Sequence, residues 1–344
     1  MDQLRPLHRS EACSLYEIVG GPEDAARRYL VSTPETRSIC NDPTVVGLAY
    51  TNALRQACRK ALERLREHQP WPLREARTTV LHILRGGLNF GLRDALHEAY
   101  GWNRHGSAFI SAQRARRSSN LEDWHITEGS YQKVYLAPEA DIVFGDVVAT
   151  GTSLEYALQQ LLILAKKAGA SIRSVLFFSI GGIRSEEILN KIQIACRQRF
   201  PGFVGAATVY FEGRFGIAFP DTDLRIKISG TDLLRKNGLY TPEFIESQYD
   251  DPAYPIERCA IYDAGSRAFW LPEFVEDVWD YWLQTSWLAK EGVTYADLLK
   301  ERAPDLDPAR FEAPDLLDLC ERQIAACERL LEGMDLPKPA FKKE

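Results

Sequence analysis

The chain has 344 residues, of which 45% are hydrophobic and 26% charged, a balance typical of a soluble globular protein. Its net charge of -6 argues against nucleic acid or an anionic membrane surface as a partner, because such partners are usually met by a clustered basic excess. The charge does not exclude small anionic metabolites, which need only a local positive pocket.

Cysteine usage indicates a reducing compartment, and hydropathy indicates a chain without a membrane-spanning segment. The seven cysteines are scattered and show no spacing typical of a zinc site, which favours reduced thiols. The first residues lack an apolar segment of signal-peptide length, and no stretch approaches the length of about 18 apolar residues that a membrane span needs. We therefore expect a cytoplasmic protein without membrane or nucleic-acid partners.

The first part of the chain predicts an arm and a helix. Residues 1–30 are mixed, carry the turn signal Gly20-Gly21-Pro22 and are interpreted as an N-terminal arm. Residues 43–70 repeat apolar residues at helical spacing and end in basic residues, as the C-terminal turn of a helix prefers. That segment is predicted to be a long amphipathic helix.

Strand and helix signals then alternate. Apolar or β-branched runs predict strands at residues 78–84, 141–144, 174–182 and 205–211, and helical patterns occur around residues 154–169 and 188–197. Such alternation implies right-handed crossovers and an α/β fold with a mainly parallel sheet and helices on both faces.

Two segments depart from this alternation. Residues 113–130 are polar and basic, lie between two short predicted strands, and are expected to form a mobile surface segment. After residue 270 the strand signals stop, so we expect an α/β domain over residues 31–270 and an all-helical extension over residues 271–344.

The strongest motif is IVFGDVVATGTS at residues 142–153. A strand that feeds a tight turn onto a helix aims several backbone N–H groups and the positive end of the helix at one point, and the hydroxyls at residues 150–153 add donors. A phosphate monoester fits there, and Asp146 can accept hydrogen bonds from sugar hydroxyls. The alternative is an ordinary strand-to-helix turn capped by Ser or Thr.

This combination of apolar strand, acid and A-T-G-T-S resembles the phosphoribosyl-pyrophosphate (PRPP) loop of the type I phosphoribosyltransferases. A second motif, HILRGGLNFG at residues 82–91, resembles the pyrophosphate-contacting loop of the uracil branch of that family, although a strand-turn-helix with a surface arginine is the alternative. STPETR, the segment around Arg114 and CAIYDAGSR resemble further parts of that branch, so the resemblance covers about residues 30–270.

The resemblance implies a type I phosphoribosyltransferase-like fold, a homodimer, and an enzyme that transfers 5-phosphoribose from PRPP to an aromatic or heterocyclic acceptor with release of pyrophosphate. Asp146 and Arg85 would be catalytic. Mg²⁺ would be held by pyrophosphate and ribose oxygens without direct protein ligands. The remaining implied contacts are the 5′-phosphate with Ala149, Thr150, Gly151, Thr152 and Ser153, the pyrophosphate with Arg85, Gly86, Gly87 and Arg114, and the acceptor with Tyr262, Asp263, Ala264 and Gly265.

Four positions depart from the family pattern. Gly145 stands where most members have the first of two acids, and Ala149 stands where purine-type members place an acid. In the acceptor segment, Tyr262 replaces a glycine and Ser266 a second acid. Uracil and 6-oxopurines are therefore disfavoured as acceptors. Two alternatives stay open: a PRPP- or nucleotide-sensing regulator on the same fold, and a specialised-metabolism enzyme that joins phosphoribose to an unusual acceptor, including by a C-glycosidic bond.

Overall fold

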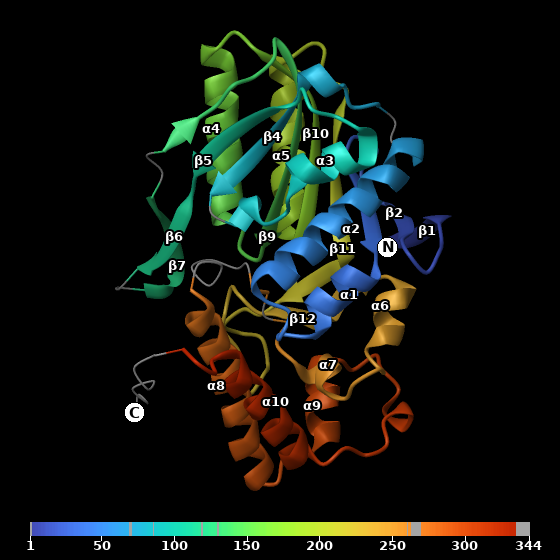
Figure 1. The fold of residues 1–344 in the computed structure, drawn as a ribbon, viewed down its shortest axis with the longest axis vertical. Coiled ribbons are helices and arrows are strands. Elements are labelled where there is room, and N and C mark those ends of the chain that lie inside the picture. Colours follow the sequence, from blue (N-terminus) through green and yellow to red (C-terminus); the bar gives the residue numbers. More distant parts are fainter. Residues whose placement is uncertain are drawn as a thin grey trace.

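A sheet of ten strands forms the centre of the molecule (Figure 1). The computed structural model describes residues 2–68, 71–84, 86–117, 120–128, 131–259, 261–262 and 270–334. The strand order is β1-β2-β3-β11-β10-β9-β4-β5-β8, and β12 pairs with β11. The strands are β1 (Gln3–His8), β2 (Ser14–Val19), β3 (Arg27–Ser32), β4 (Thr78–Leu84), β5 (Gly106–Ser111), β8 (Gln132–Lys133), β9 (Glu139–Val148), β10 (Ser171–Gly182), β11 (Gly205–Ile217) and β12 (Leu233–Tyr240).

The inner part of this sheet is parallel. Each neighbouring pair from β3 through β11, β10, β9 and β4 to β5 runs in the same direction, whereas β1, β2, β8 and β12 pair antiparallel. The predicted mainly parallel sheet is confirmed.

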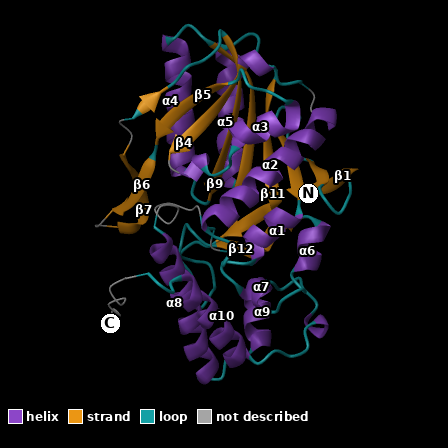
Figure 2. Cartoon of the chain, in the orientation of Figure 1, coloured by secondary structure: helices purple, strands orange, loops and turns teal. Residues whose placement is uncertain are grey.

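Helices cover both faces of the sheet (Figure 2). Side chains alternate between the two faces of a strand, and successive residues of β9 are apolar, so both faces of the sheet have to be covered. Val143 belongs to the hydrophobic core shared with α2 and α3, whereas Ile142 and Phe144 belong to the core shared with α4 and α5. These helices are α1 (Pro34–Asn41), α2 (Gly47–His68), α3 (Leu92–Tyr100), α4 (Thr152–Lys167) and α5 (Arg184–Arg199).

Two segments take a form that the sequence patterns did not predict. Residues 3–32, expected to lie mostly in an N-terminal arm, supply β1, β2 and β3, and most side chains of β2 and β3 are buried. The polar segment expected to be mobile forms a separate two-stranded ribbon of β6 (Gln113–Arg117) and β7 (Asn120–Glu128) over its described residues. Its high polarity masked an alternation that supports antiparallel pairing.

The C-terminal part packs as a helical unit below the sheet in Figure 1, as expected for the described residues after 270. Its own hydrophobic core includes the fully buried Trp282. The helices after β12 are α6 (Pro242–Ser247), α7 (Ala253–Ile256), α8 (Leu271–Lys290), α9 (Tyr295–Arg302) and α10 (Leu316–Leu330). Within the described ranges, every helix falls short of the length or apolarity that a membrane crossing requires.

Candidate functional site

Strands β4 and β9 lie side by side, but the chain leaves them in opposite directions. After β4 it passes through α3 to β5 on one side, and after β9 it passes through α4 to β10 on the other. Such a reversal opens a crevice at the carboxyl ends of the two strands, which is where open α/β sheets bind ligands. Both motifs singled out in the sequence follow these two strands. We therefore take the ends of β4 and β9 as the candidate site.

The loop after β9 presents the start of α4 to this crevice. Gly151, in a left-handed conformation with φ of 74°, is the N-cap residue of α4 and provides no side-chain hydrogen bond to the helix. The first-turn N–H groups of α4 are thus left without an N-cap side chain, as an anion site requires. Thr150 Oγ1 lies 3.3 Å from Thr152 Oγ1, so two of the predicted hydroxyl donors are adjacent.

Close packing against α5 requires glycine at position 151. A Cβ atom there would lie 2.4 Å from Cδ1 of Ile188 and 2.9 Å from Cγ of Arg184. Glu155, in the first turn of α4, forms ion pairs with Arg184 at 2.9 Å and with Lys191 at 3.0 Å. The acidic side chain nearest the start of α4 is therefore neutralised by α5.

The loop after β4 rests directly on β9. Residues 86–88 form the short 3₁₀ turn η2 (Gly86–Leu88), and Gly87 is buried. A Cβ atom on Gly87 would lie only 3.0 Å from the carbonyl oxygen of Gly145. The structure thus packs the turn after β4 against the strand that precedes the second loop, while Arg85 lies outside the described residues.

A ring fills the position where the family pattern has its first acid. A Cβ atom on Gly145 would lie 2.3 Å from Cγ of Phe90, and the Phe90 side chain is fully buried. Gly145 is therefore a packing requirement of this chain. The sequence interpretation missed Phe90, whose only signal was its place within the glycine-rich LNFG segment.

Asp146 projects to the other face of β9, because neighbouring residues of a strand alternate. It is half-buried and lies beside Ser179 of β10 in the parallel register. Further along, a Cβ atom on Gly181 of β10 would lie 2.3 Å from the carbonyl oxygen of Val148. Gly181 therefore permits close approach of β10 to the last residue of β9, whereas Gly182 permits close approach to β11.

His82 lies in β4 just before the η2 turn. Its ring stacks on Phe109 of β5, with centroids 4.9 Å apart and an interplanar angle of 18°. Burial, helped by the nearby Arg93 cation, lowers the pKa of His82. Its side chain is 5% exposed, and its role beside the loop is that of a packed, neutral ring.

On the predicted acceptor side, Tyr262 joins two helices. Its ring meets Tyr50 of α2 edge-on with centroids 5.4 Å apart, and Phe274 of α8 with centroids 5.5 Å apart. Asp263, Ala264 and Gly265 lie outside the described residues, and only the backbone of Arg114, in β6, is described.

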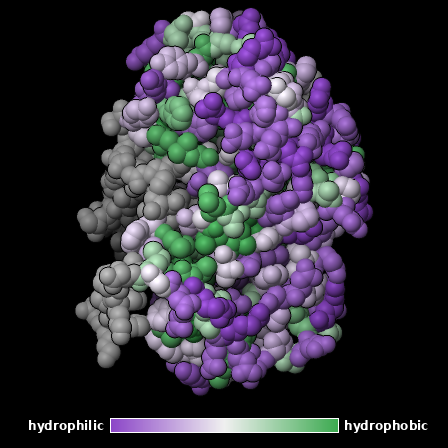
Figure 3. Space-filling model, in the orientation of Figure 1, coloured by the Kyte–Doolittle hydropathy of each residue, from purple (hydrophilic) through white to green (hydrophobic). Residues whose placement is uncertain are grey.

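An apolar surface adjoins the two loops. Figure 3 shows hydrophobic residues gathered across the middle of one face, over the area where Figure 1 places the end of β9 and the starts of α2 and α8. The exposed fraction is 79% for Leu48 in the first turn of α2, 44% for Leu88 in η2, and 54% for Trp270 before α8.

Among the described residues, no three His, Cys, Asp or Glu side chains are arranged to hold a metal ion.

No family model matches the chain, and no curated protein matches its sequence. Solved structures with similarity include adenine phosphoribosyltransferase from Trypanosoma brucei in complex with AMP, pyrophosphate and ribose-5-phosphate, at 14% identity over 58% of this chain and 87% of that chain, with a TM-score of 0.33. A hypoxanthine phosphoribosyltransferase from Staphylococcus aureus matches at 14% identity over 56% of this chain and 89% of its own, with a TM-score of 0.27. Identities and TM-scores this low do not establish a family.

Proposed function

We propose that the protein binds PRPP together with Mg²⁺ between the ends of β4 and β9 and transfers its phosphoribosyl group to an aromatic or heterocyclic acceptor. The observation that supports this proposal is that the two motifs follow the adjacent strands β4 and β9, at the point where the strand order reverses. The turn after β4 packs directly on β9, because a Cβ atom on Gly87 would lie 3.0 Å from the carbonyl oxygen of Gly145.

Each part of the donor has a matching group in this proposal. The loop residues 149–153 hold the 5′-phosphate through N–H groups and hydroxyls, and Asp146 accepts hydrogen bonds from ribose hydroxyls. Arg85, Gly86 and Gly87 hold the pyrophosphate, with Arg114 closing over the donor. No protein ligand is assigned to Mg²⁺, which would enter with the donor and supply positive charge against the leaving diphosphate.

The reaction needs little covalent chemistry from the protein. The bond between the anomeric carbon of ribose and a pyrophosphate oxygen breaks, and pyrophosphate leaves with the electron pair. The acceptor atom forms the new bond to that carbon and releases its proton. Catalysis then rests on positioning and on stabilising the charges that separate in the transition state.

The residues expected to contact the acceptor depart from the family pattern. The chain is nearest the uracil branch in its motifs, but Ala149 and Tyr262 depart from the patterns that bind purines and uracil. The apolar surface in Figure 3 favours an acceptor with an extended apolar face. Its reacting atom is nitrogen, oxygen or carbon, which only product analysis distinguishes.

Calorimetry with PRPP in the presence and absence of Mg²⁺ tests the donor site. We expect Mg²⁺-dependent binding by the wild type, and a loss of affinity of tenfold or more, about 1.4 kcal/mol, in Asp146→Asn and Arg85→Ala. Asp24→Asn makes the same chemical change at an aspartate whose side chain is 93% exposed, in the turn before β3, and should bind like the wild type. Undetectable binding at millimolar PRPP would contradict the proposal.

A regulator that binds PRPP without turnover is the second candidate. The Phe90 ring beside Gly145 favours it, because ribose contact then rests on a single carboxylate. A pyrophosphate-release assay with a panel of purines, pyrimidines and phenols separates the two functions. Donor binding with no release for any acceptor would support the regulator.

A further inference from the structure

Glu212 is a buried acid in a strained part of β11. Its side chain is fully buried, and its φ of 63° lies in the left-handed region that residues other than glycine rarely adopt. Such strain persists only where the surrounding structure holds it in place. The residue lies near the end of the buried run of β11, at the carboxyl edge of the parallel sheet, the edge that carries the candidate site.

The Glu212 carboxyl binds the first turns of two helices. Oε1 accepts hydrogen bonds from the Thr33 N–H at 3.0 Å and from the Thr36 hydroxyl, and Oε2 accepts one from the Thr241 hydroxyl at 3.2 Å. Thr33 and Thr241 are the N-cap residues of α1 and α6. One carboxyl thus links the N-terminal ends of α1 and α6 to β11. The STPETR segment, which contains Thr33 and Thr36, therefore has a structural role.

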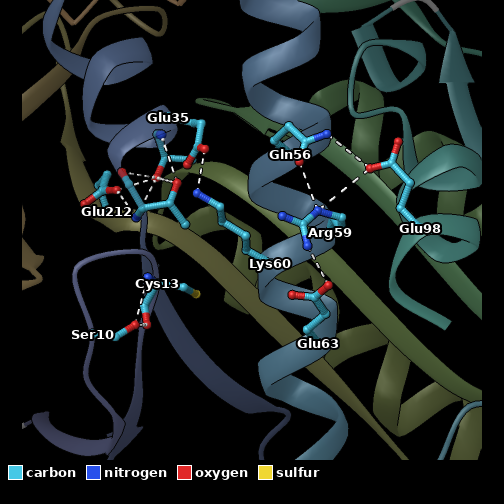
Figure 4. Close-up of polar contacts among 11 residues, drawn as sticks. Ser10, Cys13, Glu35, Gln56, Arg59, Lys60, Glu63, Glu98 and Glu212 are labelled. Carbon is cyan, nitrogen blue, oxygen red and sulfur yellow. Dashed lines mark hydrogen bonds and ion pairs between the residues drawn. The ribbon is translucent and has the colours of Figure 1, made fainter.

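Figure 4 shows Glu212 beside the first turn of α1, with Glu35 of the same turn directed at Lys60 of α2. The Lys60 ammonium lies 2.6 Å from a Glu35 carboxylate oxygen, so that acid is already paired. Glu35 therefore offers a matched comparison within the same helix cap.

Buried hydrogen bonds continue from these helices to the predicted acceptor side. At the end of α1, the Asn41 amide donates to Ser247 at 2.9 Å and accepts from Gln248 at 2.8 Å. Arg235 of β12 donates to the carbonyl of Cys40 at 3.1 Å and to that of Glu257 at 2.9 Å. The segment that contains Glu257 and Tyr262 is thus linked to α1 and α6.

Glu212 changes charge near neutral pH. Burial raises its pKa to about 7, against the opposing effect of the Thr36 and Ser32 hydroxyls, the Thr33 N–H and the Arg37 cation. The titratable groups that face it are Arg37 and Cys40 of α1 and Cys13 before β2, and burial raises the pKa of Cys13 to about 12. From α6 the contact is the neutral Thr241 hydroxyl.

We infer that Glu212 is a positioning residue whose carboxyl holds the starts of α1 and α6 together and thereby sets the placement of residues 257–259 and 261–262. Burial makes the ionised carboxyl less favourable in the folded state than in water, so loss of the proton makes opening of the two helix starts easier. The acceptor role of Tyr262 rests on the proposed function, whereas the coupling of the two helix starts does not.

Hydrogen exchange of the full chain at pH 6 and pH 8, corrected for the intrinsic pH dependence of exchange, tests this inference. A group with a folded pKa near 7 and an open-state value near 4.5 predicts a loss of protection of about tenfold over residues 33–42 and 241–262 as the pH rises. Glu212→Gln should abolish this dependence, while Glu35→Gln should retain it.

Two results would overturn the inference: Glu212→Gln with the wild-type pH dependence, or a wild-type change over residues 33–42 and 241–262 no larger than that over α4. If the Gln variant does not fold, the second criterion decides from the wild type and Glu35→Gln alone. PRPP calorimetry on the same samples keeps the outcomes separate, because absent donor binding contradicts the proposed function and leaves the exchange result intact.

Discussion

The proposed donor side and the proposed acceptor side of the candidate site differ in the contacts that hold them together. On the donor side, β4 and β9 end in loops whose close contacts depend on the absence of a side chain at Gly87, Gly145 and Gly151. On the acceptor side, buried charged and polar groups such as Glu212 and Arg235 hold residues that are far apart in the chain. Donor-side substitutions should therefore act on ligand binding, and acceptor-side substitutions on stability.

The largest effect on stability should come from Asp232, which forms an ion pair of 2.9 Å with Arg258 although both side chains are almost completely buried. Asp232→Ala leaves the Arg258 cation without its partner, and we expect a loss of about 4 kcal/mol in the free energy of unfolding by urea. Glu246→Ala removes an exposed partner of Arg310 and should give no measurable change. Equal losses of unfolding free energy in Asp232→Ala and Glu246→Ala would contradict the stabilising role assigned to the buried ion pair.

A smaller effect on stability, with a larger effect on ligand binding, is expected from Gly151→Ala. The new Cβ combines an unfavourable positive φ with a clash at Ile188, and the loss should be about 2 kcal/mol, with PRPP affinity reduced about 100-fold. Gly169→Ala is the matched control, because Gly169 has a φ of 65° and open space around its Cβ position. Denaturation and calorimetry on both variants separate backbone strain from the clash; similar PRPP affinities would show that the loop after β9 is not the donor site.

The smallest expected effect is on the pH dependence of stability, and it comes from the buried ring of His82. Its folded pKa is lowered by burial, so the unfolded chain binds a proton near pH 6.5 that the folded chain does not. The wild type should therefore lose stability relative to His82→Phe as the pH falls below about 6.5. Glu212 contributes the opposite sign, because its raised pKa costs stability as the pH rises from about 4.5 to 7. Parallel stability curves for the wild type and His82→Phe would contradict the first statement.

The sequence predicted the two strand-turn-helix units at β4 and β9 because each is one contiguous segment. A strand, a glycine turn and a helix leave local signals, and both units occur at the predicted residues, whereas their contacts with a donor stay a prediction. Phe90 was missed because its significance depends on contact with Gly145, 55 residues away on another strand. The acceptor-side network could not be predicted, since Asn41 and Gln248 are separated by 207 residues and a glutamate with positive φ has no sequence signature.

The two outer edges of the sheet constrain how copies of this chain can associate. β1 at one edge contains Pro6, which has no N–H to donate, and the charged Arg5, while β8 at the other edge is only two residues long. Edges of this kind resist the addition of a further strand, which protects a sheet against aggregation. We therefore expect that a dimer of this chain does not join its two sheets through β1 or β8.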